Sequence, residues 1–164
     1  MAYQRLQVSR SLAVIPSTTV LIPDPATEMF SGIADFSVAG TLTDVGTTFT
    51  TLGIEPGKAI VYNTTAAIAY YIDAVTDNLN LSLSPSSAGG ATDSYVIYAY
   101  ATQACTLYSG TAQDITVYMS ADTGNMHAPT TTQKFTAIPA GSFMPTLVTG
   151  VSTADTPTNL IALW

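Results

Sequence analysis

Alternation of apolar and polar residues is the feature that most constrains the fold of this chain. Two successive segments carry apolar residues at every second position: Ile68, Tyr70, Ile72 and Ala74 in the first, and Leu79, Leu81 and Leu83 in the second. A period of two places alternate side chains on opposite faces of a β-strand. Asp77 and Asn78 lie between the segments and tolerate the positive φ of a tight turn. The sequence therefore predicts a β-hairpin here.

The same pattern recurs along the chain, and no stretch follows the 3.6-residue period of an α-helix. Further strands are predicted at Thr18–Ile22, Thr48–Leu52, Ala59–Tyr62, Tyr95–Ala101, Ala104–Tyr108, Ile115–Met119, Lys134–Ile138, Phe143–Thr149 and Asn159–Trp164. Asp24 and Pro25 predict only a short helical turn toward Phe30, with Asp24 as its cap. Strands and turns spaced about ten residues apart predict an all-β fold, an antiparallel β-sandwich or barrel of jelly-roll-like type.

The two ends of the chain differ from its middle in composition and in the spacing of predicted strands. Residues 40–100 form a compact run of predicted hairpins between turns rich in glycine and serine, whereas the flanks contain most of the prolines that shape long connections. We interpret residues 1–39 and 101–164 as one sandwich formed by both chain ends, with 40–100 as an inserted small β-domain. A single continuous sandwich is the alternative.

A low content of charge indicates a chain that associates with other proteins. Only 9% of the 164 residues are charged, against 47% hydrophobic, and the net charge is −7. Charge is depleted at the centres of protein interfaces, so we expect a large permanent interface. Arg5 and Arg10 give the first ten residues a positive charge, which predicts that this end docks on an acidic surface. The acidic remainder disfavours binding to nucleic acid, and no apolar run reaches the ~20 residues that span a membrane.

The last predicted strand is apolar on both faces. Leu160, Ala162 and Trp164 share one face, and Ile161 and Leu163 share the other. A strand of this kind is covered on both sides. We expect one face to pack on the core of the subunit, and we place Ile161, Leu163 and Trp164 in an apolar seam with a neighbouring subunit.

Tyrosines gather in the middle of the chain, at Tyr70, Tyr71, Tyr95, Tyr98 and Tyr100. Tyrosine offers a large contact area with a polar tip, which suits subunit contacts and also stacking on sugars. We favour subunit contact, with Tyr98 and Tyr100 as the interface residues. Binding of a host glycan is the alternative for the same residues.

Enzymatic sites are poorly supported by the sequence. His127 is the only histidine, and Asp73, Asp77 and Asp114 lie at turns or strand starts, where carboxylates serve backbone hydrogen bonds. Asp122, Asn125 and His127 are too few ligands for a calcium or zinc site. Cys105, the only cysteine, lies in a strand-like pattern and is expected to be a buried thiol. We predict no enzymatic activity, no metal and no cofactor.

Three segments carry a resemblance to a known family. They are Leu12–Thr18 followed by Ile22–Pro25, Cys105–Gly110 leading to Asp114–Val117, and Ile138–Pro145 with Thr158–Trp164. Together they resemble the head spike-base proteins of gene transfer agents and related virion proteins of tailed phages. The segment Gly53–Thr65 resembles a small β-module of phage structural proteins. The stretch from Ala121 to Thr132 is longer, and richer in threonine and proline, than the family pattern.

The resemblance implies a virion structural protein on the outer surface of the capsid. Its role would be that of a capsid decoration (cement) or spike-base subunit that stabilises the shell or seats a fibre. The implied partners are further copies of itself in a trimer or pentamer, the major capsid protein, and a fibre or spike protein where one attaches. A receptor- or glycan-binding module of a tail or head fibre is the alternative function.

Overall fold

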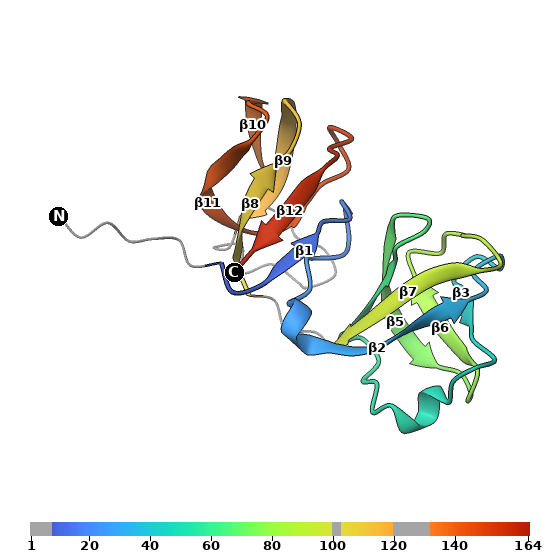
Figure 1. Cartoon of the computed structure of the whole chain (residues 1–164). Coiled ribbons are helices and arrows are strands. Elements are labelled where there is room, and N and C mark those ends of the chain that lie inside the picture. The colour runs from blue at the N-terminus through green and yellow to red at the C-terminus, as the bar shows by residue number, and fades with distance from the viewer. Residues whose placement is uncertain (1–7, 100–102, 120–131) are drawn as a thin grey trace.

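The structure is a computed structural model that describes residues 8–99, 103–119 and 132–164 (Figure 1). The described residues form twelve β-strands in two antiparallel sheets of six strands each, and contain no α-helix. The two sheets pack as a sandwich and do not close into a barrel. The all-β sandwich predicted from the alternation is therefore confirmed.

The first sheet, sheet A, joins strands from both ends of the described chain in the order β1-β12-β8-β11-β9-β10. Its strands are β1 (Ser11–Ala13), β8 (Cys105–Ser109), β9 (Gln113–Met119), β10 (Thr132–Ile138), β11 (Ser142–Val151) and β12 (Leu160–Leu163). The core of this sheet is a cluster of buried apolar residues that includes Leu107, Ile115, Val117, Val148 and Ala162.

The second sheet, sheet B, is built from the middle of the chain in the order β2-β7-β4-β5-β6-β3. Its strands are β2 (Glu28–Ala34), β3 (Thr41–Thr43), β4 (Ala59–Asn63), β5 (Ile68–Val75), β6 (Asn80–Ser84) and β7 (Asp93–Ala99). A bridge between Asp35 and Thr43 joins the ends of its two edge strands. Phe36, Phe49, Tyr70, Tyr95 and Ile97 are among the residues that fill its core.

Strand β2 departs from the sequence interpretation. It lies within the range 1–39 that we assigned to the sandwich of the chain ends, but it pairs with β7 in sheet B. The helical turn predicted at Asp24 is only the 3-10 turn η1 (Pro25–Thr27), capped by Asp24 through the amide of Ala26 at 2.9 Å. The chain turns there and continues as β2 instead of a helix toward Phe30. The division into two domains stays a prediction.

The predicted hairpin is β5 and β6, which pair in antiparallel fashion with Ile72 opposite Leu83. Tyr70, Ile72, Leu81 and Leu83 are buried in the core of sheet B, as the alternation indicates. Leu79 belongs to the turn instead and is 38% exposed.

Two predicted strands are wrong, and local hydrogen bonds explain both. At Thr18–Ile22 the Ser17 hydroxyl accepts from the amides of Thr19 and Val20, so these donors do not enter a ladder. Thr48–Leu52 contains the 3-10 turn η2 (Phe49–Thr51). Its apolar residue Phe49 is buried in the core of sheet B, which accounts for the strand-like apolar signal.

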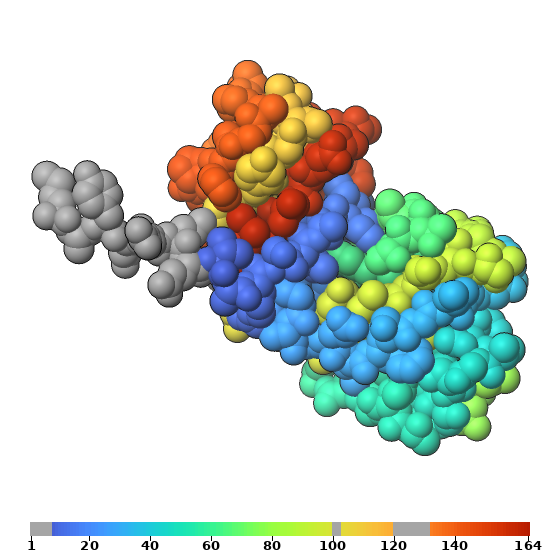
Figure 2. Space-filling model, viewed as in Figure 1, coloured from blue at the N-terminus to red at the C-terminus, as the bar shows by residue number. Residues whose placement is uncertain are grey.

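Residues 14–22, which we call the strap, run between the two sheets. Backbone amides tie the strap to sheet A: Val14 donates to Leu160, Ser17 to Val151, and Ile22 to Thr149. Side chains of sheet B cover its other side in a third apolar cluster, formed by Val20, Ile60, Tyr62, Ala69, Tyr71 and Tyr98. In Figure 2 the strap residues (blue) lie between the orange and red strands of sheet A and the green strands of sheet B. The strap therefore joins the two sheets.

Candidate docking surface

The outer face of sheet A is apolar and open to solvent. In β8, Cys105, Leu107 and Ser109 point into the core, so Thr106 and Tyr108 point outward. The same alternation exposes Phe143 and Leu147 on β11 and Ile161 on β12. Their exposed fractions are 55%, 52% and 37%. A sheet face with large apolar side chains in water has the character of a docking surface.

Cross-strand register joins these residues into two rows. Tyr108 lies opposite Phe143 on one side and Ile161 on the other. Thr106 lies between Leu147 and Leu163 in the same way. We call these six residues the outer face. The rings of Tyr108 and Phe143 contact each other with centroids 5.3 Å apart.

Strands β8, β11 and β12 contain no charged residue, although the whole chain carries a net charge of −7. Lys134 on β10 pairs with Asp114 on β9 at 3.1 Å and with Asp155, between β11 and β12, at 2.6 Å, and the backbone of Arg10 bonds to that of Trp164 beside β12. An apolar area without charge costs little to dehydrate, so it favours contact with another apolar surface.

The structure places the three residues of the predicted apolar seam on different sides of β12. Ile161 and Leu163 lie on the outer face, as the alternation indicates. Trp164 packs instead against the core of sheet A, and its indole N–H donates to the backbone carbonyl of Gln103 at 3.0 Å. Trp164 therefore has contacts within the chain on the other side of the strand, and its place in a seam with a neighbouring subunit stays a prediction.

Arg10 forms an ion pair within the chain. Its Nη1 donates to both carboxylate oxygens of Asp24 at 2.7 and 2.9 Å, and the Asp24 side chain is only 3% exposed. Asp24 in turn caps η1, so the pair fixes the entry of the chain into β2. Arg10 is thus engaged in an ion pair inside the subunit, and its role in docking on a partner stays a prediction. Arg5 lies outside the described residues.

Replacing Arg10 by alanine is expected to lower the free energy of unfolding by about 1–3 kcal/mol, because the Asp24 carboxylate then stays buried without its cation. Urea denaturation of the variant measures this loss. Lys58→Ala is the control, since Lys58 pairs with Glu55 at 2.9 Å, both side chains are largely exposed, and such pairs contribute little. Equal stability of the two variants would contradict a structural role for Arg10.

The predicted interface tyrosines are not on the surface. Tyr98 is 4% exposed and contacts the ring of Tyr62 at 5.7 Å in the cluster under the strap. Burial, with a smaller contribution from Glu28, raises the pKa of Tyr98 to about 12. Tyr98 is therefore an internal packing residue, and its assignment to a partner surface is wrong. Tyr100 lies outside the described residues.

Sequence reasoning missed a role that three tyrosines share. Tyr71 accepts a hydrogen bond from the amide of Leu21 at 3.4 Å, and Tyr118 donates to the carbonyl of Thr18 at 3.3 Å. Tyr62 bonds to the backbone of Ile15. Tyrosine hydroxyls of both sheets thus hold the strap. The signal in the sequence was the apolar content of both faces of 59–62 and 68–72, which indicates burial on both sides.

Two of the three carboxylates considered for catalysis, Asp77 and Asp114, serve the fold. Asp77 accepts from the amide of Leu79 and from the side chain of Asn80 within the hairpin turn. The bond from Asn80 lowers its pKa. The pKa of Asp114 is lowered first by the amide of Ala137 and then by Lys134. Both groups stay ionised at neutral pH and are poor general acids.

Asp114, Lys134 and Asp155 form a charge cluster, and the ionisation of Asp155 makes its contribution to stability depend on pH. Its pKa is lowered, mainly by the hydrogen bond from Lys134, and that of Asp114 is lowered as well. A depressed pKa adds stability that is present above the ordinary value of 3.8 and is lost as the pH falls through the folded value. Lys134→Ala should therefore flatten the decline of the urea midpoint below roughly pH 4. Lys134→Arg should retain the decline. If the urea midpoint of Lys134→Ala falls at low pH as steeply as that of the wild type, the cluster is not the source of this pH dependence.

Cys105 is buried, as predicted. Its thiol donates to the carbonyl of Val148 at 3.5 Å, and burial raises its pKa to about 12. Within residues 8–99, 103–119 and 132–164, no group of three His, Cys, Asp or Glu side chains could hold a metal ion. The metal-ligand candidates Asp122, Asn125 and His127 lie outside these ranges.

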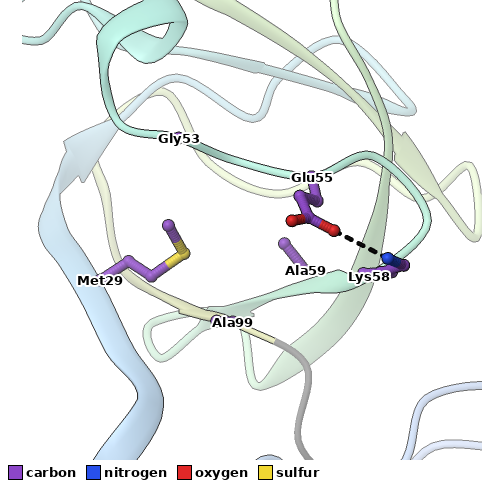
Figure 3. A pocket seen from close by; sticks show the side chains of 6 residues that line it. All are labelled: Met29, Gly53, Glu55, Lys58, Ala59 and Ala99. Atoms are coloured by element: carbon purple, nitrogen blue, oxygen red, sulfur yellow. Dashed lines mark hydrogen bonds and ion pairs between the residues drawn. The ribbon is translucent and has the colours of Figure 1, made fainter.

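A small hollow of about 170 Å³ lies at one end of sheet B (Figure 3). Met29, Ala59 and Ala99 form its apolar part, and the ion pair between Glu55 and Lys58 lies beside it. The hollow has one short ion pair and no further charged lining residue, so its chemistry suggests no particular ligand.

No family model, curated protein or solved structure matches the chain. The resemblance to phage virion proteins stays a prediction. None of the helical segments in the described ranges has the length and apolar character to cross a membrane.

Proposed function

We propose that this chain is a structural subunit of a tailed-phage particle, a capsid decoration (cement) or spike-base protein that oligomerises on the head surface. The outer face of sheet A is the observation that carries the proposal. It is a charge-free apolar surface on a chain that is otherwise acidic, and it is made by strands that also form the core. The protein works by contact and performs no catalysis.

The size of the outer face determines how much of a stable protein interface it can form. A stable interface buries about 800 Å² on each partner. Three half-exposed side chains, Phe143, Leu147 and Ile161, supply the apolar centre of such an area, and the polar residues around them supply its rim. Further copies of the chain and the major capsid protein are the partners that we propose, with a fibre or spike protein where one is seated. Several contacts of this kind per subunit would stabilise a shell against opening.

The alternative function, a receptor- or glycan-binding module, loses its main support. The tyrosines proposed for stacking on sugars include Tyr70, Tyr71, Tyr95 and Tyr98, all of which are at most 4% exposed. Aromatic rings bind sugars through open faces, and these four rings are covered by the protein itself.

Two measurements test the proposal. Light scattering of the purified chain should give a trimer or pentamer of the 17.1 kDa subunit. Particles banded by density from the source cells should contain the chain in stoichiometric amounts by quantitative mass spectrometry. A monomer that binds host polysaccharide and is missing from the particles would replace this proposal with the glycan-binding alternative.

A further inference from the structure

A second apolar surface lies at the far end of sheet B. Ile33 on β2 is 64% exposed, and Val45, just after β3, is 85% exposed. Between them lies a hollow of about 300 Å³, which we call the tip hollow; its apolar lining is Ile33, Ala34, Val45 and Ala91. Such exposure of aliphatic side chains beside a hollow marks an interaction surface.

The walls of the tip hollow are held in place by the fold. Asp35 and Thr43, which also line it, exchange two backbone hydrogen bonds of 2.8 and 2.9 Å across the gap between β2 and β3. The Asp35 carboxylate accepts from the amide of Ser37 at 2.7 Å, and hydrogen bonds from the side chain and then the amide of Ser37 lower its pKa. This charge is hydrogen-bonded within its own turn, and the other residues that line the hollow are uncharged.

The outer face supplies a side chain of the right kind for this hollow. Phe143 is 55% exposed and is held against Tyr108, so little conformational freedom is lost when it binds. An apolar cavity of roughly 150 Å³ accommodates a benzene molecule. The tip hollow is about twice that size, which leaves room for the ring of Phe143 and part of a neighbouring aliphatic side chain.

The two surfaces cannot meet within one chain. In Figure 1, β11 lies at one side of sheet A, and the end of β2 that carries Ile33 lies at the opposite side of the molecule. A contact between them therefore joins two copies. Each copy has a net charge of −7, so copies approach each other most easily through surfaces with little charge; the outer face has none, and Asp35 is the one charged lining residue of the tip hollow.

We infer that Phe143 of one copy inserts into the tip hollow of a second copy. This inference rests on the self-association in the proposed function and names the contact that produces it. The contact uses two different surfaces, so it is heterologous and closes into a ring when the rotation between copies allows it. A face-to-face contact of two outer faces would leave Ile33 and Val45 in water, whereas the heterologous contact covers both surfaces at once.

The test uses variants at three exposed positions. Phe143→Ala removes the inserted ring, and Ile33→Lys places a charge at the hollow. Val38→Lys is the matched control, because Val38 is also 64% exposed, lies in the adjoining turn and does not line the hollow. Light scattering should give the 17.1 kDa monomer for the first two variants and the wild-type mass for the control. Circular dichroism and the melting temperature verify that each variant is folded.

Mixing the two defective variants gives the decisive result. Phe143→Ala retains an intact hollow and Ile33→Lys retains an intact Phe143, so an equimolar mixture should form a dimer and nothing larger. If Ile33→Lys keeps the wild-type mass while Phe143→Ala dissociates, copies associate through the outer face alone, and this inference fails while the proposed function stands. A wild-type chain that is monomeric at every concentration overturns both.

Discussion

Replacing Tyr62 by alanine is expected to lower the free energy of unfolding by about 3–5 kcal/mol, the range for removal of a large aromatic side chain from a core. Tyr62 is 2% exposed on the central strand β4, and its ring meets that of Tyr98 at 5.7 Å. It also bonds to the strap at Ile15. The substitution thus opens a cavity at the place where the two sheets are joined. Urea denaturation followed by fluorescence and circular dichroism measures the loss.

Tyr62→Phe separates packing from hydrogen bonding. It keeps the ring and removes only the hydroxyl, so it should cost about 1–2 kcal/mol. A second expectation concerns cooperativity: if the cluster under the strap couples the sheets, Tyr62→Ala should broaden the transition or divide it into two steps. A loss below about 1 kcal/mol for the alanine variant would mean that the strap does not hold the sheets together.

Ile161→Lys is expected to raise the dissociation constant for self-association about 100-fold or more. Ile161 is 37% exposed and is the β12 member of the outer face. An ammonium group buried in an interface without a partner costs several kcal/mol, and each 1.4 kcal/mol is a tenfold change in affinity. Sedimentation velocity over a range of concentrations measures the shift.

Leu79→Lys is the matched control for this variant. Leu79 is 38% exposed, but it lies in the turn before β6 in sheet B and belongs neither to the outer face nor to the tip hollow. The two substitutions introduce the same charge at the same degree of exposure, so a general effect of charge would change both alike. Equal self-association of the two variants would show that the outer face is not the docking surface.

The sequence was most informative where one side of a strand faces water. In β12 the alternation correctly divided Leu160 and Ala162 from Ile161, and in β6 it correctly placed Leu81 and Leu83 in the core. Asp24 and Pro25 also predicted the capped turn that is present in the structure. Each of these features depends on neighbours within a few residues, so it is visible in the sequence.

The candidate site could be predicted only in part. The outward direction of Ile161 and Leu163 follows from the alternation. That Phe143 and Leu147 lie on the same surface follows only from the register of β8 with β11 and β12. Arg10 was assigned to docking because it adds positive charge to the first ten residues, and Tyr98 was assigned to an interface because tyrosine offers a large contact area with a polar tip. In the structure Arg10 pairs with Asp24, 14 residues away, and Tyr98 packs under the strap. Both side chains therefore have partners inside the chain.

The sequence by itself determined that this protein is all-β, which side most of its strands present inward, and that it carries little charge. Only the tertiary structure decided that β2 belongs to sheet B, that residues 14–22 form a strap and that this strap lies over Tyr62, Tyr71 and Tyr98. The physical reason is the range of the interactions. The direction of a side chain along a strand is a local property of the backbone, whereas what covers that side chain depends on segments far away in the sequence.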